Sequence, residues 1–184
     1  MKDPNKYVSF EKCITEGKIC EALFSDHYLT PFGLQVADVT NIKQYQKIGA
    51  DFIASLGHKW ECKGNYRDNL EIIIEDWSDY RPEINQFIPG WFFTSTADVI
   101  VSISKKTVNV VGMKRSKKLV DDYNKIKNYY RLIRNDISYD LRGNVWRSAF
   151  RVIPCEIIKE HLFFLIKPPD DLNTNGKPIQ LNLF

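Results

Sequence analysis

The chain has 184 residues, 43% of them hydrophobic and 27% charged, and a formal net charge of +3. This length and composition predict one globular domain with its own hydrophobic core and exclude an extensively disordered chain. The charge is too small to indicate a polyanionic partner by itself, because nucleic-acid binding depends on where basic residues lie. The first residues form no apolar signal peptide and no segment reaches membrane-spanning length, so we expect a cytoplasmic protein without membrane contact.

The cysteines and histidines are placed irregularly. The four cysteines include no CxxC pair, and the three histidines are scattered along the chain. We therefore expect free thiols in a reducing compartment, and we do not expect a structural zinc site.

Two stretches are rich in basic residues, and each offers either a local patch for a polyanion or an ordinary solvated helix face. The sequence leaves both interpretations open. The members are Lys114, Arg115, Lys117 and Lys118 in the first stretch and Arg142, Arg147 and Arg151 in the second.

The first half of the chain predicts a helix followed by short strands. Hydrophobic residues at helical spacing indicate an amphipathic helix over residues 9–27, within an N-terminal helical region of residues 1–30. Pro31 and Gly33 end this helix, and Gly57 makes a turn between two later strands. The predicted strands are residues 34–40 (a short strand or an extended lead-in), 51–56, 58–63 and 70–77.

The second half continues with strands and helices in alternation. Pro82 and Pro89 bracket an irregular stretch, and residues 168–184 predict a loose tail. The element order predicts the α/β class of mixed α+β type, in one domain, with a central mixed β-sheet flanked by helices. The further elements are a hairpin of residues 97–103 and 107–111 turning at Lys105-Lys106, a helix over 116–134, a strand near 147–153 and a helix begun by Pro154.

Residues 46–63 contain the most informative group of side chains. Side chains alternate along a strand, so Glu61 and Lys63 share one face of their predicted strand and Trp60 lies on the other. Asp51 begins the preceding strand, and a tight turn at Gly57 would bring it beside Glu61. Two carboxylates and one ammonium group would then meet.

This group suits phosphodiester hydrolysis. Carboxylates provide the hard oxygen ligands that Mg²⁺ prefers, and a bound metal polarises the phosphate and helps to deprotonate a water molecule. Lys63 would orient that water and offset the charge that grows on the phosphate. The alternative is a hairpin with a solvated polar face, because an acid-x-Lys triplet alone is common.

A longer ordered set of residues resembles the PD-(D/E)xK nuclease superfamily, which has the restriction-endonuclease-like fold and includes Holliday junction resolvases. The resemblance covers about residues 35–112. Ala50 stands where the proline that names the family precedes the aspartate, and this departure removes no metal ligand. The residues that carry the resemblance are Gln46, Gly49-Ala50-Asp51, Glu61-Cys62-Lys63, Asn69, Glu75, Gly90-Trp91 and Ala97-Asp98.

The resemblance implies roles for particular residues. It implies that Asp51 and Glu61 bind Mg²⁺ (or Mn²⁺), with the backbone carbonyl of Cys62 as a further ligand and its side chain in the core. Lys63 becomes the catalytic lysine, and Gln46 orients Asp51 or contacts DNA. Family members often add a carboxylate from the first helix, for which Glu16 and Glu21 are well spaced and Glu11 is less well spaced. Asp38 and Glu75 are further candidates for the metal site, and each of these acidic residues also fits a structural or solvated position.

The function implied is that of a metal-dependent endodeoxyribonuclease, a hydrolase acting on duplex or branched DNA in restriction, repair or a mobile element. A homodimer is expected, because two sites would reach two strands. One alternative is a non-catalytic DNA-binding or complex-assembly protein on the same scaffold. The other is a small α+β interaction protein, in which Glu61 and Lys63 would face bulk solvent far from Asp51.

Overall fold

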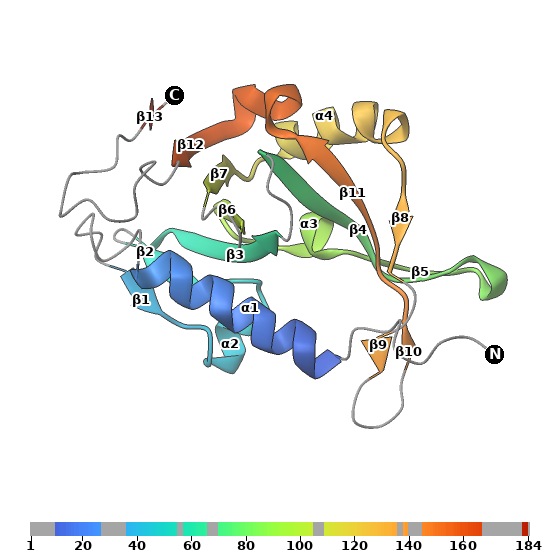
Figure 1. Ribbon diagram of the computed structural model, residues 1–184, viewed down its shortest axis with the longest axis horizontal. Helices are drawn as coiled ribbons and strands as arrows, with labels where there is room; N and C mark the ends of the chain where they lie inside the picture. Colours follow the sequence, from blue (N-terminus) through green and yellow to red (C-terminus); the bar gives the residue numbers. More distant parts are fainter. Residues whose placement is uncertain are drawn as a thin grey trace.

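A mixed seven-stranded β-sheet forms the centre of the computed structural model, in the order β1-β2-β3-β6-β7-β12-β13 (Figure 1). Strands β3 and β6 are parallel, and the other neighbouring pairs are antiparallel. The structure describes residues 10–26, 36–54, 57–65, 70–104, 109–135, 138–139, 145–166 and 182–183. The strands are β1 (Val36–Asp38), β2 (Phe52–Ala54), β3 (Lys59–Asn65), β6 (Val99–Ser104), β7 (Val110–Lys114), β12 (Leu162–Ile166) and β13 (Asn182–Leu183).

A second, antiparallel sheet of four strands lies against the first, in the order β5-β4-β11-β8. Its strands are β4 (Glu71–Arg81), β5 (Gln86–Pro89), β8 (Ile133–Arg134) and β11 (Ala149–Pro154), and β9 (Ser138–Tyr139) pairs with β10 (Val145–Trp146) separately. The helices are α1 (Phe10–Phe24), α2 (Lys43–Gln46), α3 (Trp91–Thr94) and α4 (Lys117–Ile126), with 3-10 turns η4 (Pro82–Ile84), η5 (Lys127–Tyr129) and η6 (Cys155–His161).

Helix α1 covers one face of the central sheet and runs along β3 (Figure 1). Phe24 packs its ring against Phe52 of β2 and Trp60 of β3, with ring centroids 5.7 and 6.0 Å apart. Trp60 in turn contacts Phe164 of β12 at 5.9 Å. Burial of these large rings fixes the helix on the sheet, because apolar area removed from water is the main stabilising contribution.

The second sheet, α3 and α4 cover the opposite face. Ile72 and Ile74 of β4 pack with Phe92 of α3, Met113 of β7 and Tyr123 of α4 in a second core cluster. Strand β6 is buried along its whole length, as expected for a strand with both faces covered. The predicted central mixed sheet flanked by helices is thus confirmed. Among the described helices, none has the length and apolar character needed to cross a membrane.

Several predicted elements differ from the structure. The helix expected over residues 116–134 ends at Ile126, because Ile133 and Arg134 pair with β11 instead. Pro154 precedes a 3-10 segment rather than an α-helix, and the apolar run after it forms strand β12, which sequence reasoning missed. A short apolar run fits a buried helix or a strand equally well, so only pairing decides.

Two further predictions concern the chain's loops and end. The stretch bracketed by two prolines contains η4 and β5, because β5 pairs with β4. The turn at Lys105-Lys106 and most of the predicted tail lie outside the described residues. Within that tail, Asn182 and Leu183 form β13 and pair with β12.

Candidate active site

Asp51 lies immediately before β2, where the pairing of β2 with β3 stops. Its backbone N–H donates to the carbonyl of Trp60 at 2.8 Å. Its carboxylate Oδ2 accepts a hydrogen bond from the backbone N–H of Cys62 at 2.7 Å. The side chain of Asp51 therefore continues the ladder by one more bond, and this fixes the carboxylate at the edge of β3. Gly57, with φ +80°, provides the left-handed residue in the connection between the two strands.

The alternation of side chains along β3 separates the core from the polar group. Trp60 and Cys62 pack into the core cluster under α1. Glu61 faces the other way and is only 3% exposed. The Nζ of Lys63 lies 2.6 Å from Oε1 of Glu61, and about a third of the Lys63 side chain is exposed (33%). The three side chains are therefore neighbours: Glu61 pairs with Lys63, and Asp51 interacts electrostatically with both.

The second carboxylate oxygen of Glu61, Oε2, is buried without a hydrogen-bond partner among the described residues. A carboxylate oxygen only accepts hydrogen bonds, and leaving one buried and unsatisfied costs about 1–3 kcal/mol or more. Neighbouring atoms pack tightly around Oε2, since a Cβ added to Gly49 would lie only 3.1 Å from this oxygen. An oxygen of this kind is suited to a cation, which would supply the missing partner.

Two more carboxylates approach this group, one from each side of the sheet. Burial, followed by the negative charge of Asp51, raises the pKa of Glu21 on α1. Burial also raises the pKa of Glu75 on β4, although its Oε2 accepts a hydrogen bond from the N–H of Trp91 at 3.1 Å. Glu16 lies five residues before Glu21 and so points to a different side of the helix. Glu21 is thus a first-helix carboxylate that interacts electrostatically with Asp51 and Lys63.

The electrostatic balance of the site is negative. Burial opposes the charged form of Lys63, but the carboxylates of Glu61 and Asp51 outweigh it and raise the lysine pKa. Burial is the main cause that raises the pKa of Asp51, against the attraction of Lys63. The Lys63 ammonium group thus interacts with carboxylates from α1, from the residue before β2, from β3 and from β4, and an added divalent cation would reduce their mutual repulsion.

The remaining predicted residues occupy different positions. Gln46 is exposed on α2, and its Nε2 donates to the carbonyl of Thr40 at 2.5 Å, so it supports the loop before Asp51 rather than the carboxylate. The N–H and C=O of one strand residue point to the same side. The carbonyl of Cys62 therefore faces the edge at which Asp51 lies, while its thiol is buried. Asp38 on β1 is exposed and accepts hydrogen bonds from Thr40.

Sequence reasoning did not anticipate the part played by Gly49 and Trp91 in the packing of the site. The Nζ of Lys63 lies 5.4 Å from the centre of the Trp91 ring, which covers the ammonium group from α3. For Gly49, the indication that the sequence offered was its position two residues before Asp51. Nothing in the spacing of Trp91 indicated its contact with Lys63, because β4 and β5 lie between them in the chain.

Substitution of Gly49 tests the close approach to Glu61. Gly49 has φ +67°, and an added Cβ would also lie 3.1 Å from the Oγ of Ser95. We expect Gly49→Ala to lower the free energy of unfolding by more than the roughly 1–2 kcal/mol that a left-handed backbone alone costs. The control is Gly57→Ala, at φ +80°, where the added Cβ meets nothing within 4 Å among the described residues. Equal losses for the two variants in urea denaturation would contradict the crowding.

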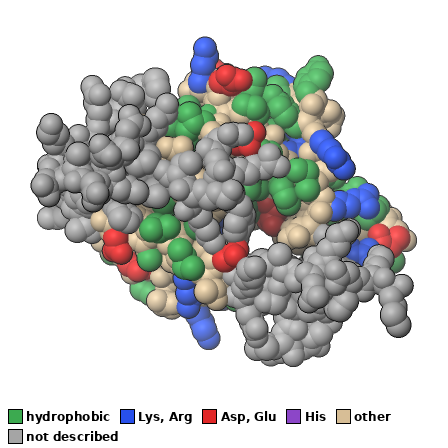
Figure 2. All heavy atoms as spheres, viewed as in Figure 1, with side chains coloured by type: hydrophobic (Ala, Val, Ile, Leu, Met, Phe, Trp, Pro, Cys, Tyr) green, Lys and Arg blue, Asp and Glu red, His purple; other side chains and the backbone are tan. Residues whose placement is uncertain are grey.

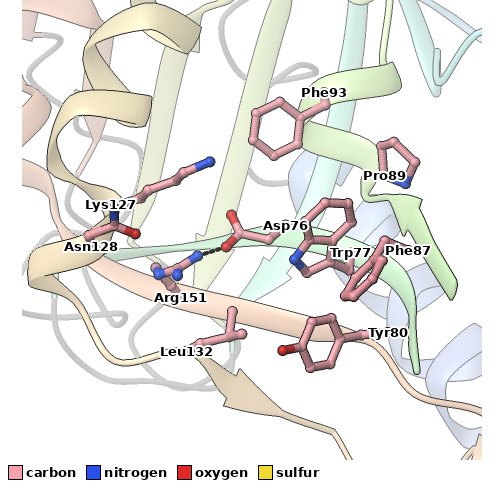
Figure 3. Close-up of a pocket in the computed structure, with 10 residues that line it drawn as sticks. All are labelled: Asp76, Trp77, Tyr80, Phe87, Pro89, Phe93, Lys127, Asn128, Leu132 and Arg151. Carbon is pink, nitrogen blue, oxygen red and sulfur yellow. Dashed lines mark ion pairs between the residues drawn. The ribbon is translucent and has the colours of Figure 1, made fainter. Parts of the chain in front are cut away.

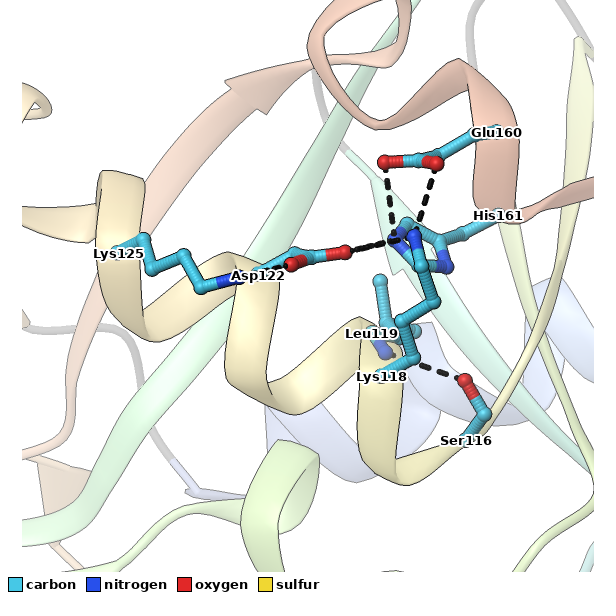
Figure 4. Close-up of polar contacts among 7 residues, drawn as sticks. All are labelled: Ser116, Lys118, Leu119, Asp122, Lys125, Glu160 and His161. Carbon is cyan, nitrogen blue, oxygen red and sulfur yellow. Dashed lines mark hydrogen bonds and ion pairs between the residues drawn. The ribbon is translucent and has the colours of Figure 1, made fainter.

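A different group could also hold a metal by its donor types: Asp122, Glu160 and His161 (Figure 4). Asp122 is already bound by Lys118 at 2.9 Å and by Lys125 at 2.7 Å. These hydrogen bonds hold the pKa of Asp122 far below its usual range. The ammonium groups occupy the place of a cation, so this group is an ion-pair network that joins α4 to η6.

The two basic stretches do not form simple patches. In the first, Arg115 donates to the carbonyls of Phe92 and Phe93 at 3.2 Å, and Lys118 takes part in the network above. In the second, Arg147 pairs with Glu83 and Arg151 pairs with Asp76, while Arg142 lies outside the described residues.

Comparison with known proteins found no matching family model, no matching curated protein and no matching solved structure. A functional interpretation therefore depends on the geometry of the side chains described above.

Proposed function

We propose that this chain is a Mg²⁺-dependent endonuclease that hydrolyses phosphodiester bonds in duplex or branched DNA, on a restriction-endonuclease-like scaffold. The observation that carries the proposal is the buried Oε2 of Glu61, which lacks a partner among the described residues, beside Asp51 and Lys63. An interaction protein has no need for a buried acidic group of this kind, because its burial destabilises the fold.

The donor set fits a hard divalent cation. The carboxylates of Asp51 and Glu61, together with the carbonyl of Cys62, would hold Mg²⁺ or Mn²⁺. When bound, the ion would polarise the scissile phosphate and lower the pKa of a water molecule. Glu21 and Glu75 would stabilise the ion's remaining water shell by accepting hydrogen bonds.

Lys63 would act on the phosphate rather than on the metal. Its ammonium group is held by Glu61 at 2.6 Å and covered by Trp91, so it is fixed in one direction before substrate arrives. A fixed positive charge beside a phosphate stabilises the charge that develops in the transition state, because little reorganisation is then required. Double-strand cleavage would need two such sites, and we propose a homodimer.

The raised carboxyl pKa values give the proposal a pH dependence. Because burial raises the pKa of Glu21, Asp51 and Glu75, protons compete with the metal at pH values above the usual carboxyl range. We expect Mg²⁺ affinity, measured by isothermal titration calorimetry, to fall several-fold between about pH 7.5 and about pH 5.5, with proton release on binding. An affinity that stays constant over this interval would contradict metal binding by these residues.

The function itself is tested by cleavage. Purified chain is incubated with supercoiled plasmid, linear duplex and a four-way junction, with Mg²⁺, Mn²⁺ or EDTA. Metal-dependent cutting that is lost in Asp51→Asn supports the proposal. Binding of DNA without cutting under every metal condition would instead indicate a non-catalytic scaffold, and cutting that survives the substitution would indicate a contaminant or another site.

A further inference from the structure

A pocket of about 570 Å³ lies between the second sheet and the end of α4 (Figure 3). This volume falls within the range of pockets that bind small organic groups. Its walls come from β4, β5, α3, η5 and β11, and none of the residues that form them belongs to the carboxylate site. The pocket is therefore a second feature that the proposed chemistry does not explain.

One wall of the pocket is a group of aromatic rings from the β4–β5 hairpin. The ring of Phe87 lies 5.4 Å from that of Trp77 and 5.5 Å from that of Tyr80. Trp77 and Tyr80 are stacked with centroids 6.4 Å apart. Because the rings support one another and Phe87 is 39% exposed, they offer a preformed surface on which a flat ring can stack.

Positive charge lies on the opposite wall and also beside the aromatic wall. Lys127 extends into the pocket, with its Nζ 5.6 Å from the ring of Phe93, and the guanidinium of Arg134 lies 4.8 Å from the ring of Tyr80. Lys and Arg side chains lie beside hydrophobic ones on the side of the molecule where β8 and β5 are found (Figure 2). No carboxylate among the described residues pairs with Lys127 or Arg134, so both charges are available to an anion.

The acidic residues close to the pocket are already neutralised. Asp76, at its floor, pairs with Arg151 and accepts a hydrogen bond from Tyr123. Asp79, three residues further along β4, pairs with Arg81 at 2.8 Å. The surface that faces a ligand therefore combines aromatic rings with uncompensated positive charge.

We infer that this pocket binds an unpaired nucleotide of a DNA strand, with its base stacked on the ring of Trp77, its edge against the inclined ring of Phe87 and its phosphate near Lys127. Stacking on aromatic rings together with contacts from basic side chains is the general chemistry of single-strand recognition. An apolar peptide or a lipid chain would satisfy the rings but would bury Lys127 without a counter-charge. The side-chain amide of Asn128, on the same wall, can donate to and accept from a base edge.

This inference deepens the proposed function, on which its choice of DNA rests. Strand β4 carries Glu75 at the carboxylate site and also Asp76 and Trp77 at the pocket. Helix α3 likewise carries Trp91 at the carboxylate site and Phe93 at the pocket. One DNA strand could therefore engage both. The substrate class that fits is DNA with unpaired nucleotides next to the cut, such as a branched junction or a tailed duplex.

The test measures binding in EDTA, so that cleavage is not required. Fluorescence anisotropy of a labelled oligothymidylate of about 12 nucleotides is compared with that of a duplex of the same length. We expect the single strand to bind more tightly than the duplex, and Phe87→Ala and Lys127→Ala each to weaken its binding by about 10-fold. The controls are Ile88→Ala, next to Phe87 and 48% exposed, and Lys117→Ala, at the other end of α4, which should change binding by less than about 2-fold.

Several results would overturn the inference. These are a wild-type chain that does not bind the single strand, equal binding of single strand and duplex, or equal effects of the two pocket variants and their controls. Phe87 is exposed and Lys127 is half-buried, so thermal unfolding of each variant checks that a loss of binding does not come from a loss of folding. If the chain binds the single strand in a way that depends on Phe87 but does not cleave plasmid, the nuclease proposal is removed and the binding site stands. If the chain cleaves plasmid but its binding of the single strand does not depend on Phe87, the nuclease proposal stands and the pocket inference is removed.

Discussion

Lys63→Ala is expected to lower the rate of DNA cleavage by about 10²–10³-fold while leaving metal binding intact. The ammonium group stabilises charge on the phosphate, and it binds no metal, so its loss affects the chemical step. Mg²⁺ affinity should stay at least as high as in the wild type, because a positive charge 2.6 Å from Glu61 is removed. Single-turnover cleavage and calorimetry with Mg²⁺ measure the two effects separately.

The matched control for this variant is Lys59→Ala. Lys59 is on the same strand, and its Nζ contacts only the hydroxyl of Thr96 at 3.5 Å among the described polar contacts. We expect this variant to cleave at close to the wild-type rate. Equal loss of cleavage in both lysine variants would assign the effect to general weakening of DNA contacts and would remove Lys63 from the catalytic role.

Asp51→Asn is expected to abolish cleavage, with a loss on the order of 10³-fold or more, and to weaken Mg²⁺ binding. The same substitution should stabilise the metal-free protein by about 0.5–2 kcal/mol, raising its melting temperature by a few degrees. Asparagine keeps an oxygen that accepts the hydrogen bond from the N–H of Cys62, and it removes a carboxylate from a site with excess negative charge. A gain in stability with a loss of activity is characteristic of a functional residue.

The pH dependence of this stabilisation follows from the raised pKa of Asp51. The folded chain holds the proton of this carboxyl more tightly than the unfolded chain does. The stability that it contributes is present below the usual carboxyl pKa and is lost as the pH rises through the raised pKa. The gain from Asp51→Asn should therefore be larger at about pH 8 than at about pH 4.

The control for Asp51→Asn is Asp98→Asn. Asp98 also accepts a hydrogen bond from a backbone N–H of β3, that of Lys59, at 2.8 Å. It lies away from the carboxylate site, so its replacement should leave cleavage and Mg²⁺ affinity unchanged. Similar loss of activity in both aspartate variants would mean that the support of β3, rather than a metal, explains the effect.

The sequence predicted the local parts of the candidate site well. Alternation along residues 58–63 placed Glu61 and Lys63 on one face and Trp60 on the other, because a strand with one buried face has a fixed period of two. A glycine at 57 and an acidic residue at the start of the preceding strand were enough to predict that Asp51 would approach Glu61. The resemblance implied that Gln46 orients Asp51 or contacts DNA, whereas in the structure its Nε2 lies on α2 and donates to the carbonyl of Thr40.

The parts that sequence reasoning missed depend on contacts between distant segments. The pairing of β3 with β6 joins strands that are separated by β4, β5 and α3, and no local pattern encodes it. Strand β12 and the aromatic pocket arise in the same way, since the rings of Trp77 and Phe87 meet Lys127 only after the second sheet has formed. The approach of Glu75 to the site also depends on how the two sheets pack.

The most direct measurement is the anomalous scattering of Mn²⁺ in crystals of the chain grown with that ion. We predict a peak that contacts the carboxylates of both Asp51 and Glu61, including the Oε2 that is buried without a partner among the described residues. The peak should be absent from crystals of Asp51→Asn. Well-ordered crystals in which Mn²⁺ leaves these carboxylates empty, or binds only at Asp122 and His161, would contradict the metal site and the nuclease activity derived from it.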